Sequence, residues 1–570
     1  MCRKICGGFE DGEMTPLTRT RNKNPSPQRK LGPHFFTLSA LLKSGVPAFA
    51  GMTFVVFANV GMAGQLIIPK FADETKSSGL NSIYTGEWRH MVGGGVATFD
   101  CNGDGFPDVY IAGGDNKSKL YINASKRHGA LKFKEVISGA EFDHVTGAYP
   151  LDIDGDGVTD LVILRSGESK VMKGLGQCKF AETNKAWNVD GGDAWGLAFS
   201  ATWEKGNSWP TLAFGTYIDR NFENQPWGHC TDNWLLRPNA AQNSYGPRTA
   251  LTPSYCTQSM LFTDWNRSGT PSLRVSNDRE YYEGGQEQMW KVLPGQPPAL
   301  YTEAEGWKFT RLWGMGIASA DIDGSGYPAY FLTSMADQRL QMLANGATKP
   351  TYKEAEFSLG TTAHRPYAGT DTRPSTGWHA QFEDVNNDGR YDLFIAKGNV
   401  DRMPDFAQKD PSNLLLQKED GKFEEVGDKA NMLNFDEARG ASVADFNLDG
   451  KMDVLIVNRH ANVRLFRNVS AKLGHWMNLR LDNEGSNHDG IGAWIEVSHH
   501  GKVMRREIAV GGGHASGQLG YWHFGLGDDD TGAVHVIWPD GTKSDWQGVG
   551  ADKFYVLAKG KAATEWKPAH

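Results

Sequence analysis

Acidic and amide side chains recur in this chain in a nine-residue pattern that suits a calcium ion. Oxygen-bearing residues stand at positions one, three, five and nine, and a glycine stands at position six. Calcium takes roughly six to eight oxygen ligands, so a short loop with this spacing can surround it. Four copies are complete: Asp100, Asn102, Asp104 and Asp108; Asp152, Asp154, Asp156 and Asp160; Asp384, Asn386, Asp388 and Asp392; and Asp445, Asn447, Asp449 and Asp453. The sequence therefore predicts about four Ca2+ sites.

Weaker copies of the pattern stand between the second and third complete ones. A weaker metal site is predicted at Asp321, Asp323 and Ser325, where Ala329 replaces the last ligand. The copy that begins at residue 264 ends in a serine, and a further trace begins at residue 202. The pattern thus starts at residues 100, 152, 202, 264, 321, 384 and 445. Repeats of about 40 to 60 residues that contain several short strands are typical of β-propellers, so the seven starts predict seven blades.

A second repeated element predicts how the array closes. A Lys-Phe pair recurs between one loop and the next, as at Lys132-Phe133 and Lys422-Phe423. The copy at Lys70-Phe71 precedes the first loop, whereas no such pair follows the loop at Asp445. We therefore expect the N-terminal strand at Phe71 to complete the last blade and close a ring.

The complete copies resemble the FG-GAP/VCBS repeat of integrin-type propellers, which has a glycine before Asp-Phe-Asn-x-Asp-Gly and an apolar strand after it. The C-terminal part resembles an ASPIC/UnbV domain. That resemblance rests on Asn487 to Ala493, on His523-Phe-Gly525-Leu-Gly527 and on Trp538-Pro-Asp-Gly541. Together the two resemblances point to the cartilage acidic protein-like family, and they imply extracellular interaction more than catalysis.

The expected fold class is all-β, with an integrin-α-like seven-bladed propeller followed by a small all-β domain. The expected boundaries are a leader at residues 1–63, the propeller at 64–470 and the C-terminal domain at 471–570. A chain of 570 residues has ample length for two domains beyond a leader.

The first 63 residues have the pattern of a secretory leader. Basic residues between positions 19 and 30 precede an uncharged run between Lys43 and Lys70. Gly61-Met62-Ala63 offers small residues for a signal peptidase, so we expect cleavage after Ala63 and a periplasmic or extracellular location. The alternative is an uncleaved membrane anchor, because the uncharged run is long enough to span a bilayer.

The charge balance argues against nucleic acid as a partner. The formal net charge is -8, from 59 basic and 67 acidic residues, and many of the acids belong to the metal loops. A nucleic-acid binder needs a clustered basic face, and the clearest basic cluster lies in the leader.

Four of the six cysteines would remain after cleavage of the leader. Cys230 and Cys256 share one irregular insertion and form the expected disulfide. For Cys101 and Cys178, a second disulfide and two free buried thiols are both compatible with the sequence.

Tryptophans are dense between residues 187 and 313, in the part of the propeller that has lost the loop pattern. Most of them are expected to pack between the sheets of neighbouring blades. Trp227, Trp234 and Trp290 fall outside obvious strands, so they are the predicted ligand-binding residues at the surface.

The C-terminal domain is rich in glycine and histidine. Its glycines are predicted to form turns and bulges. Four of its histidines, at 475, 488, 514 and 523, are too scattered to predict a metal site and are expected to make packing contacts or turn hydrogen bonds.

The leading functional hypothesis is an exported, calcium-stabilised propeller that binds a glycan or a cell-surface protein. An enzyme that acts on polysaccharides or natural products is the second hypothesis, although no catalytic motif supports it. A structural protein of the surface or matrix is the third.

Overall fold

The computed structural model describes residues 66–221, 228–344, 346–362 and 371–568, and the predicted leader lies outside them. The described residues all belong to one unit, which spans residues 63–570. Almost all of its regular structure is β-strand, as predicted. No helix within the described ranges is long and apolar enough to cross a membrane.

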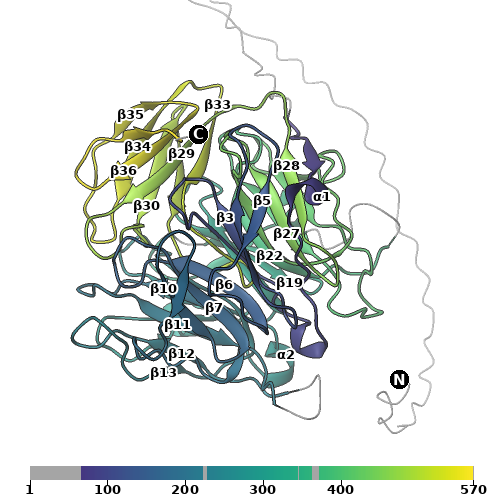
Figure 1. Ribbon diagram of the computed structural model, residues 1–570, viewed down its shortest axis with the longest axis vertical. Coiled ribbons are helices and arrows are strands. Elements are labelled where there is room, and N and C mark those ends of the chain that lie inside the picture. The colour runs from purple at the N-terminus through teal and green to yellow at the C-terminus, as the bar shows by residue number, and fades with distance from the viewer. Residues whose placement is uncertain (1–65, 222–227, 345, 363–370, 569–570) are drawn as a thin grey trace, which may run out of the picture. The chain divides into compact units, whose positions relative to one another are not determined.

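Antiparallel strands of residues 71–468 form successive four-stranded units (Figure 1). The first three units are β2 (Val96–Phe99), β3 (Asp108–Ile111), β4 (Lys119–Asn123) and β5 (Phe133–Val136); β6 (Val145–Leu151), β7 (Asp160–Gly167), β8 (Lys170–Gly174) and β9 (Phe180–Glu182); and β10 (Ala194–Thr202), β11 (Thr211–Thr216), β12 (Asn233–Leu236) and β13 (Thr249–Leu251). The next three are β14 (Thr257–Thr263), β15 (Ser272–Asn277), β16 (Gln288–Lys291) and β17 (Ala299–Leu300); β18 (Gly314–Ala320), β19 (Ala329–Ser334), β20 (Arg339–Leu343) and β21 (Tyr352–Glu354); and β22 (Gly377–Glu383), β23 (Asp392–Lys397), β24 (Asn413–Gln417) and β25 (Phe423–Glu425).

The last unit joins the two ends of the repeat array. It contains β26 (Glu437–Ala444), β27 (Asp453–Arg459) and β28 (Arg464–Asn468), and its fourth strand is the N-terminal β1 (Phe71–Asp73). Phe71 pairs with Asn468 in an antiparallel register. The prediction that the strand at Phe71 completes the last unit is therefore confirmed.

The first strand of each unit contacts the first strand of the next, and β26 contacts β2. This arrangement is propeller-like. The exact division into seven blades stays a prediction, because β10 also pairs with β7 and joins the second and third units into one sheet.

Short helices lie between the strands. They are α1 (Thr75–Ser78), α2 (Glu280–Glu283) and the 3-10 helices η2 (Trp88–His90), η3 (Glu303–Glu305) and η4 (Phe357–Leu359). Cys230 is bonded to Cys256, as expected, and Cys101 is bonded to Cys178, for which the sequence left a disulfide and two free thiols open.

Residues 475–566 form two further four-stranded sheets. One contains β29 (His475–Asp482), β33 (Trp522–Gly527), β36 (Lys553–Ala558) and β37 (Thr564–Trp566). The other contains β30 (Trp494–His499), β31 (Lys502–Glu507), β34 (Thr531–Ile537) and β35 (Gln547–Gly550). Strand β32 (Gly517–Gln518) leaves both sheets and pairs with β2.

Candidate metal centres

The four complete loops adopt one backbone fold. Each links the first strand of its unit to the second, and its ninth residue begins that second strand, as Asp453 begins β27. The glycine at position six has a positive φ in every copy, +78° at Gly450, a conformation that favours glycine. Its backbone N–H donates to the carboxylate at position one, over 2.8 Å from Gly450 N to Asp445 Oδ2. The same bond recurs at Gly105, Gly157 and Gly389.

The aspartate at position nine ties each loop to its sheet. In the last unit, one oxygen of Asp453 accepts the N–H of Phe446 over 3.2 Å and the other accepts the N–H of Asn468 over 2.8 Å. Asp108, Asp160 and Asp392 make the corresponding pair of bonds. These bonds leave lone pairs on both oxygens, because a carboxylate oxygen has more than one acceptor direction. Position nine can therefore brace the loop and still face a cation.

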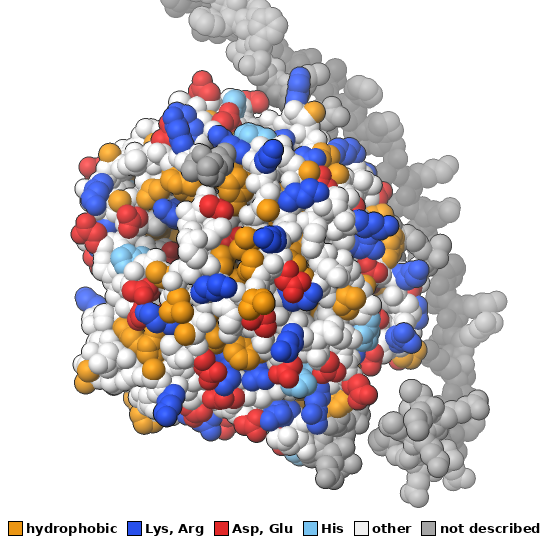
Figure 2. Space-filling model, viewed as in Figure 1, with side chains coloured by type: hydrophobic (Ala, Val, Ile, Leu, Met, Phe, Trp, Pro, Cys, Tyr) orange, Lys and Arg blue, Asp and Glu red, His pale blue; other side chains and the backbone are white. Residues whose placement is uncertain are grey.

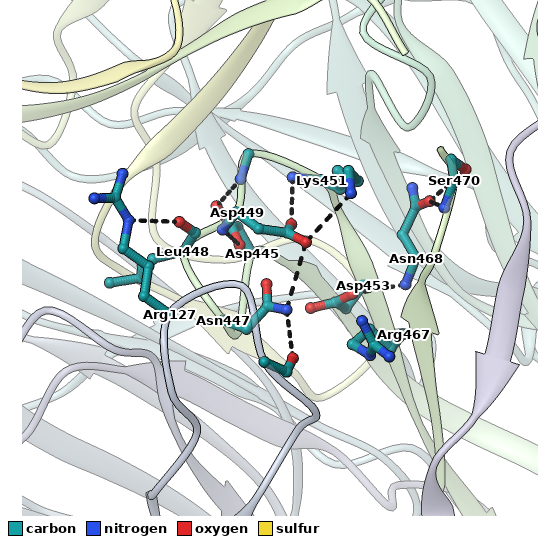
Figure 3. A network of polar contacts seen from close by, with 12 residues as sticks. Arg127, Asp445, Asn447, Leu448, Asp449, Lys451, Asp453, Arg467, Asn468 and Ser470 are labelled. Carbon is teal, nitrogen blue, oxygen red and sulfur yellow. Dashed lines mark hydrogen bonds and ion pairs between the residues drawn. The ribbon is translucent and has the colours of Figure 1, made fainter. Parts of the chain in front are cut away.

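Figure 3 shows the loop of the last unit, where Asp445, Asn447, Asp449 and Asp453 gather in one place. The amide nitrogen of Asn447 donates to Gly129 O over 2.8 Å, which fixes its orientation. Its amide oxygen is buried and accepts no hydrogen bond. A buried polar oxygen without a partner costs about 1 to 3 kcal/mol, a cost that a coordinated cation would remove.

Other loops also contain buried oxygens without a hydrogen-bond donor. Asp154 Oδ1 and Asp388 Oδ1 are of this kind. Clustered carboxylate and amide oxygens with free lone pairs are what a hard cation such as calcium requires. The donor sets of these loops therefore fit calcium, with the residues at positions one, three, five and nine as ligands.

Three of the complete loops also have a cationic side chain nearby. Lys173 Nζ contacts Asp154 and lies 2.6 Å from Asp156 Oδ2, and Arg390 Nη2 lies 2.5 Å from Asp388 Oδ2. In the last loop, Lys451 Nζ lies 3.5 Å from Asp449 Oδ2. A calcium ion in any of these loops would compete with that side chain for a carboxylate.

Burial, together with the charge of the neighbouring loop carboxylates, raises the pKa of Asp108, Asp160 and Asp445 to about 8. Without calcium, the folded protein therefore holds protons that the unfolded chain releases above about pH 4. The stability of the calcium-free protein should accordingly fall as pH rises from about 4 to 8.

This pH dependence can be measured as the melting temperature in chelator at pH 5 and pH 8, and we expect the lower value at pH 8. In saturating calcium, the decrease in melting temperature from pH 5 to pH 8 should become smaller or change sign, because the ion displaces the protons from the loop carboxylates. A calcium-free protein that melts higher at pH 8 than at pH 5 would contradict this prediction.

Comparison with known families matches the same parts of the chain. The FG-GAP-like repeat family matches residues 100–163 and 384–456, which contain the four complete loops, and the ASPIC and UnbV family matches residues 483–564. The chain contains FG-GAP-like repeats and a C-terminal ASPIC and UnbV domain. Repeats of this kind support a role as a binding or interaction module. No curated protein matches the chain.

Solved structures with similar folds share little sequence with this FG-GAP-like repeat protein. BBS1N in complex with ARL6DN is 11% identical, with 71% of this chain and 99% of that chain covered and a TM-score of 0.40. Saccharomyces cerevisiae Sqt1 is 14% identical, with 70% and 98% covered and a TM-score of 0.36. An Agrocybe aegerita protein that recognises non-reducing terminal N-acetylglucosamine is 15% identical, with 66% and 81% covered and a TM-score of 0.29.

The ASPIC and UnbV domain packs on the candidate metal loops that contain Gly450 and Gly105. A Cβ on Gly450 would lie 1.8 Å from the Trp476 ring, and one on Gly105 would lie 2.1 Å from the Trp566 ring. The glycine at position six therefore has a second role that the repeat pattern does not reveal, since it admits an aromatic side chain from the other domain.

Charged side chains of this domain reach the loops that have lost ligands. Arg505 Nη1 lies 3.0 Å from Asp321 Oδ2, where a weaker metal site was predicted. At the loop that begins with Asp264, the backbone N–H of Asp264 donates to Glu507 Oε1 over 2.6 Å. A guanidinium thus stands beside Asp321, as Arg390 stands beside Asp388, and the weaker metal site at Asp321, Asp323 and Ser325 stays a prediction.

Residues 508–520 of the same domain, the central segment, run between the first strands of the repeats. Bridges join Val510 to Ala201, Gly511 to Leu261, Gly513 to Ile317 and Ser516 to Ala148. Strand β32 then pairs with β2, His514 N–H donates to His379 on β22, and Ser516 packs on Gly440 of β26. The central segment therefore touches the first strand of every repeat unit.

The glycines of the central segment were predicted to serve turns and bulges. Gly511, Gly512 and Gly513 do have positive φ, but their surroundings show a further reason. A Cβ on Gly511 would lie 2.6 Å from Met260 O, and one on Gly513 would lie 2.5 Å from the His379 ring. At positions 511 to 513 a side chain would collide with the neighbouring strands, so only glycine fits there.

The four histidines of the domain that the prediction named make hydrogen bonds, as predicted. His523 lies 2.9 Å from Asn478 Oδ1 and 2.8 Å from Asn387 Oδ1, so it links β29 to the loop of the sixth unit. His514 Nε2 accepts the N–H of Gly93 over 3.1 Å, and burial lowers the pKa of His514 to about 3.

The predicted surface tryptophans require a correction. Trp234 lies in β12 and Trp290 in β16, and both are only 4% exposed. Trp234 stacks on Phe214, and Trp290 packs with the core around Met260 and Leu273. The prediction that they lie at the surface is wrong, because the strands of these units are irregular in sequence but still pack sheet against sheet. Trp227 lies outside the described residues.

Proposed function

We propose that this FG-GAP-like repeat protein is an exported calcium-binding protein that recognises a glycan or a cell-surface protein. The observation that carries the proposal is the set of buried loop oxygens that have no hydrogen-bond donor, at Asp154, Asp388 and Asn447. Calcium in these loops would hold the ends of the first two strands of four units together, as a structural metal rather than a catalytic one.

Two disulfides support the exported location. Cys101–Cys178 and Cys230–Cys256 would persist in an oxidising compartment and would be reduced in a cytosol. Figure 2 shows acidic and basic side chains interspersed over the face that it presents, without a continuous basic area on that face. That distribution favours a neutral or mixed-charge ligand over nucleic acid.

Exposed aromatic side chains give the proposed ligand a place to bind. Phe309 is 53% exposed at the edge of a groove of about 370 Å³, which Arg339, Lys353 and Glu354 also line. Phe357 is 78% exposed beside a neighbouring hollow that shares Arg339 and Glu354. An aromatic face beside charged hydrogen-bonding groups is a chemistry that suits a sugar ring. In the glycan hypothesis, this groove replaces the buried Trp234 and Trp290 as the expected binding surface.

A glycan array probed with the calcium-loaded full chain tests the proposal. We expect binding that weakens tenfold or more in Phe309→Ala and Phe357→Ala, because an anchor side chain carries a large share of a small interface. Trp546→Ala is the matched control, since Trp546 is 46% exposed and lies in the other domain. Undiminished glycan binding in both phenylalanine variants would exclude this groove as the binding site. If no glycan on the array is bound, the glycan is excluded as the ligand, and a cell-surface protein remains the proposed partner.

A further inference from the structure

Two histidines and an aspartate meet at a place that the repeat pattern does not involve. His90 ends η2, Asp115 follows β3, and His144 precedes β6. His90 Nε2 lies 3.1 Å from Asp115 Oδ1, His144 Nδ1 lies 3.4 Å from the same oxygen, and the two ring nitrogens are 3.4 Å apart. The rings stack with an interplanar angle of 4°. The calcium loop of this unit precedes β3 whereas Asp115 follows it, so the cluster is at the opposite end of the strand.

The three distances between the ligand atoms match those expected among three ligands of a tetrahedrally coordinated metal ion. Zinc binds histidine nitrogen and carboxylate oxygen at about 2.0 to 2.1 Å, so two ligands of a tetrahedral ion lie about 3.3 Å apart. We propose that His90, Asp115 and His144 bind a divalent transition-metal ion of the zinc class. Nitrogen and carboxylate ligands together favour such an ion over calcium, which prefers oxygen alone.

The hydrogen bonds behind His90 support this assignment. Tyr84 is fully buried and donates its hydroxyl proton to Val92 O over 2.6 Å, and the same hydroxyl oxygen lies 3.3 Å from His90 Nδ1. A neutral imidazole has a single N–H, but His90 faces an oxygen at each nitrogen. If Nδ1–H donates to Tyr84, Nε2 has no proton, and its lone pair faces the Asp115 oxygen and the His144 nitrogen. A cation bound between these three atoms would remove the repulsion among them. Metal-bound histidines commonly donate their other N–H in this way.

The cluster is open to solvent on one side. The side chain of His90 is only 1% exposed, whereas the side chains of Asp115 and His144 are each 47% exposed. A metal ion can therefore reach the cluster from solvent, and its fourth position would hold water or an exchangeable ligand.

The backbone around the cluster allows the three side chains to lie close together. His144 has a φ of +57°, and its N–H donates to Gly114 O over 2.6 Å. A Cβ on Gly86 would lie 2.5 Å from the His90 ring and 2.9 Å from Asp115 Oδ2. Glycine at position 86 thus lets the two ligands lie side by side.

Titration calorimetry on the untagged full chain in saturating calcium tests the proposal, with Zn2+ as the probe and Co2+ for visible absorption. We expect one Zn2+ per chain at this cluster and the bands of four-coordinate Co2+. Asp115→Asn and His144→Asn should each weaken Zn2+ binding at least tenfold and remove those bands. Both side chains are half exposed, and asparagine tolerates the positive φ at position 144, so the fold should survive. Tyr84→Phe should weaken binding by about tenfold or more through the loss of the second-shell partner.

His460→Asn is the matched control, because His460 also has a positive φ, of +61°, and is partly exposed near Gly86 without belonging to the cluster. It should bind Zn2+ as the unmodified chain does. The proposal is overturned if the unmodified chain binds no Zn2+, or if Asp115→Asn and His144→Asn bind it as tightly as His460→Asn does.

Discussion

Removal of calcium with a chelator should lower the free energy of unfolding of the full chain by about 5 to 6 kcal/mol. A site with a dissociation constant of about 0.1 mM in about 1 mM free calcium contributes roughly 1.4 kcal/mol, and four loops act together. The effect is comparable to the whole net stability of many domains. Urea unfolding of the full chain, with calcium and with chelator, measures it.

A comparison of Asp445→Asn with Asp264→Asn separates the effect of the metal ion on stability from the effect of the hydrogen bond within the loop. Each aspartate stands at position one and accepts the N–H of the glycine five residues later, over 2.8 Å in both cases. Only Asp445 belongs to a complete set of ligands, so only its substitution should reduce the gain in stability that calcium gives, by about one site's share of 1.4 kcal/mol. Equal stability of the unmodified chain in calcium and in chelator would refute the structural role of the metal.

Arg506→Ala should destabilise the protein by about 3 to 5 kcal/mol, because it leaves a buried carboxylate without its partner. The guanidinium of Arg506 makes two bonds of 2.7 Å to Glu383, and the two side chains are only 11% and 2% exposed. This pair joins β31 of the ASPIC and UnbV domain to β22 of the repeats. Chemical unfolding of the variant gives the free-energy difference.

Lys559→Ala removes a comparable contact from an exposed site and serves as the control. Lys559 Nζ lies 2.6 Å from Asp540 Oδ2 at the surface of the same domain, so its loss should cost less than about 1 kcal/mol. Replacement of both buried partners, as in Arg506→Met with Glu383→Leu, should recover much of the stability. A loss below about 1 kcal/mol for Arg506→Ala would show that water reaches Glu383.

The parts of the molecule that sequence reasoning predicted are those set by local spacing. The loop fold at Asp445 follows from residues within nine positions of each other, and the strand at Phe71 was recognisable because its copies recur at the same place in other repeats. The contacts of Trp476 with Gly450 and of Arg505 with Asp321 depend on how one domain packs on another. No spacing rule encodes such contacts.

The errors and omissions have the same origin. Trp234 and Trp290 looked like loop residues because their strands lack the repeat pattern, yet tertiary packing buries them. His90, Asp115 and His144 stand in three separate segments without a metal-binding motif, and the bridges from Gly114 to Thr85 and to Val145 bring these segments together. The Cys101–Cys178 bond joins two adjacent repeats in a similar way.

The central segment also has a consequence for the order in which the protein is assembled. Gly93 and His514 are 421 positions apart, yet a hydrogen bond joins them at the middle of the repeats. Contacts between such distant residues form late, because a long stretch of chain must be ordered first. During synthesis the repeats would emerge from the ribosome long before the segment that fills their centre. A nascent or truncated chain that ends before residue 508 would therefore expose the inner edges of its sheets, and it would depend on chaperones or wait in a partly folded state until the last domain arrives.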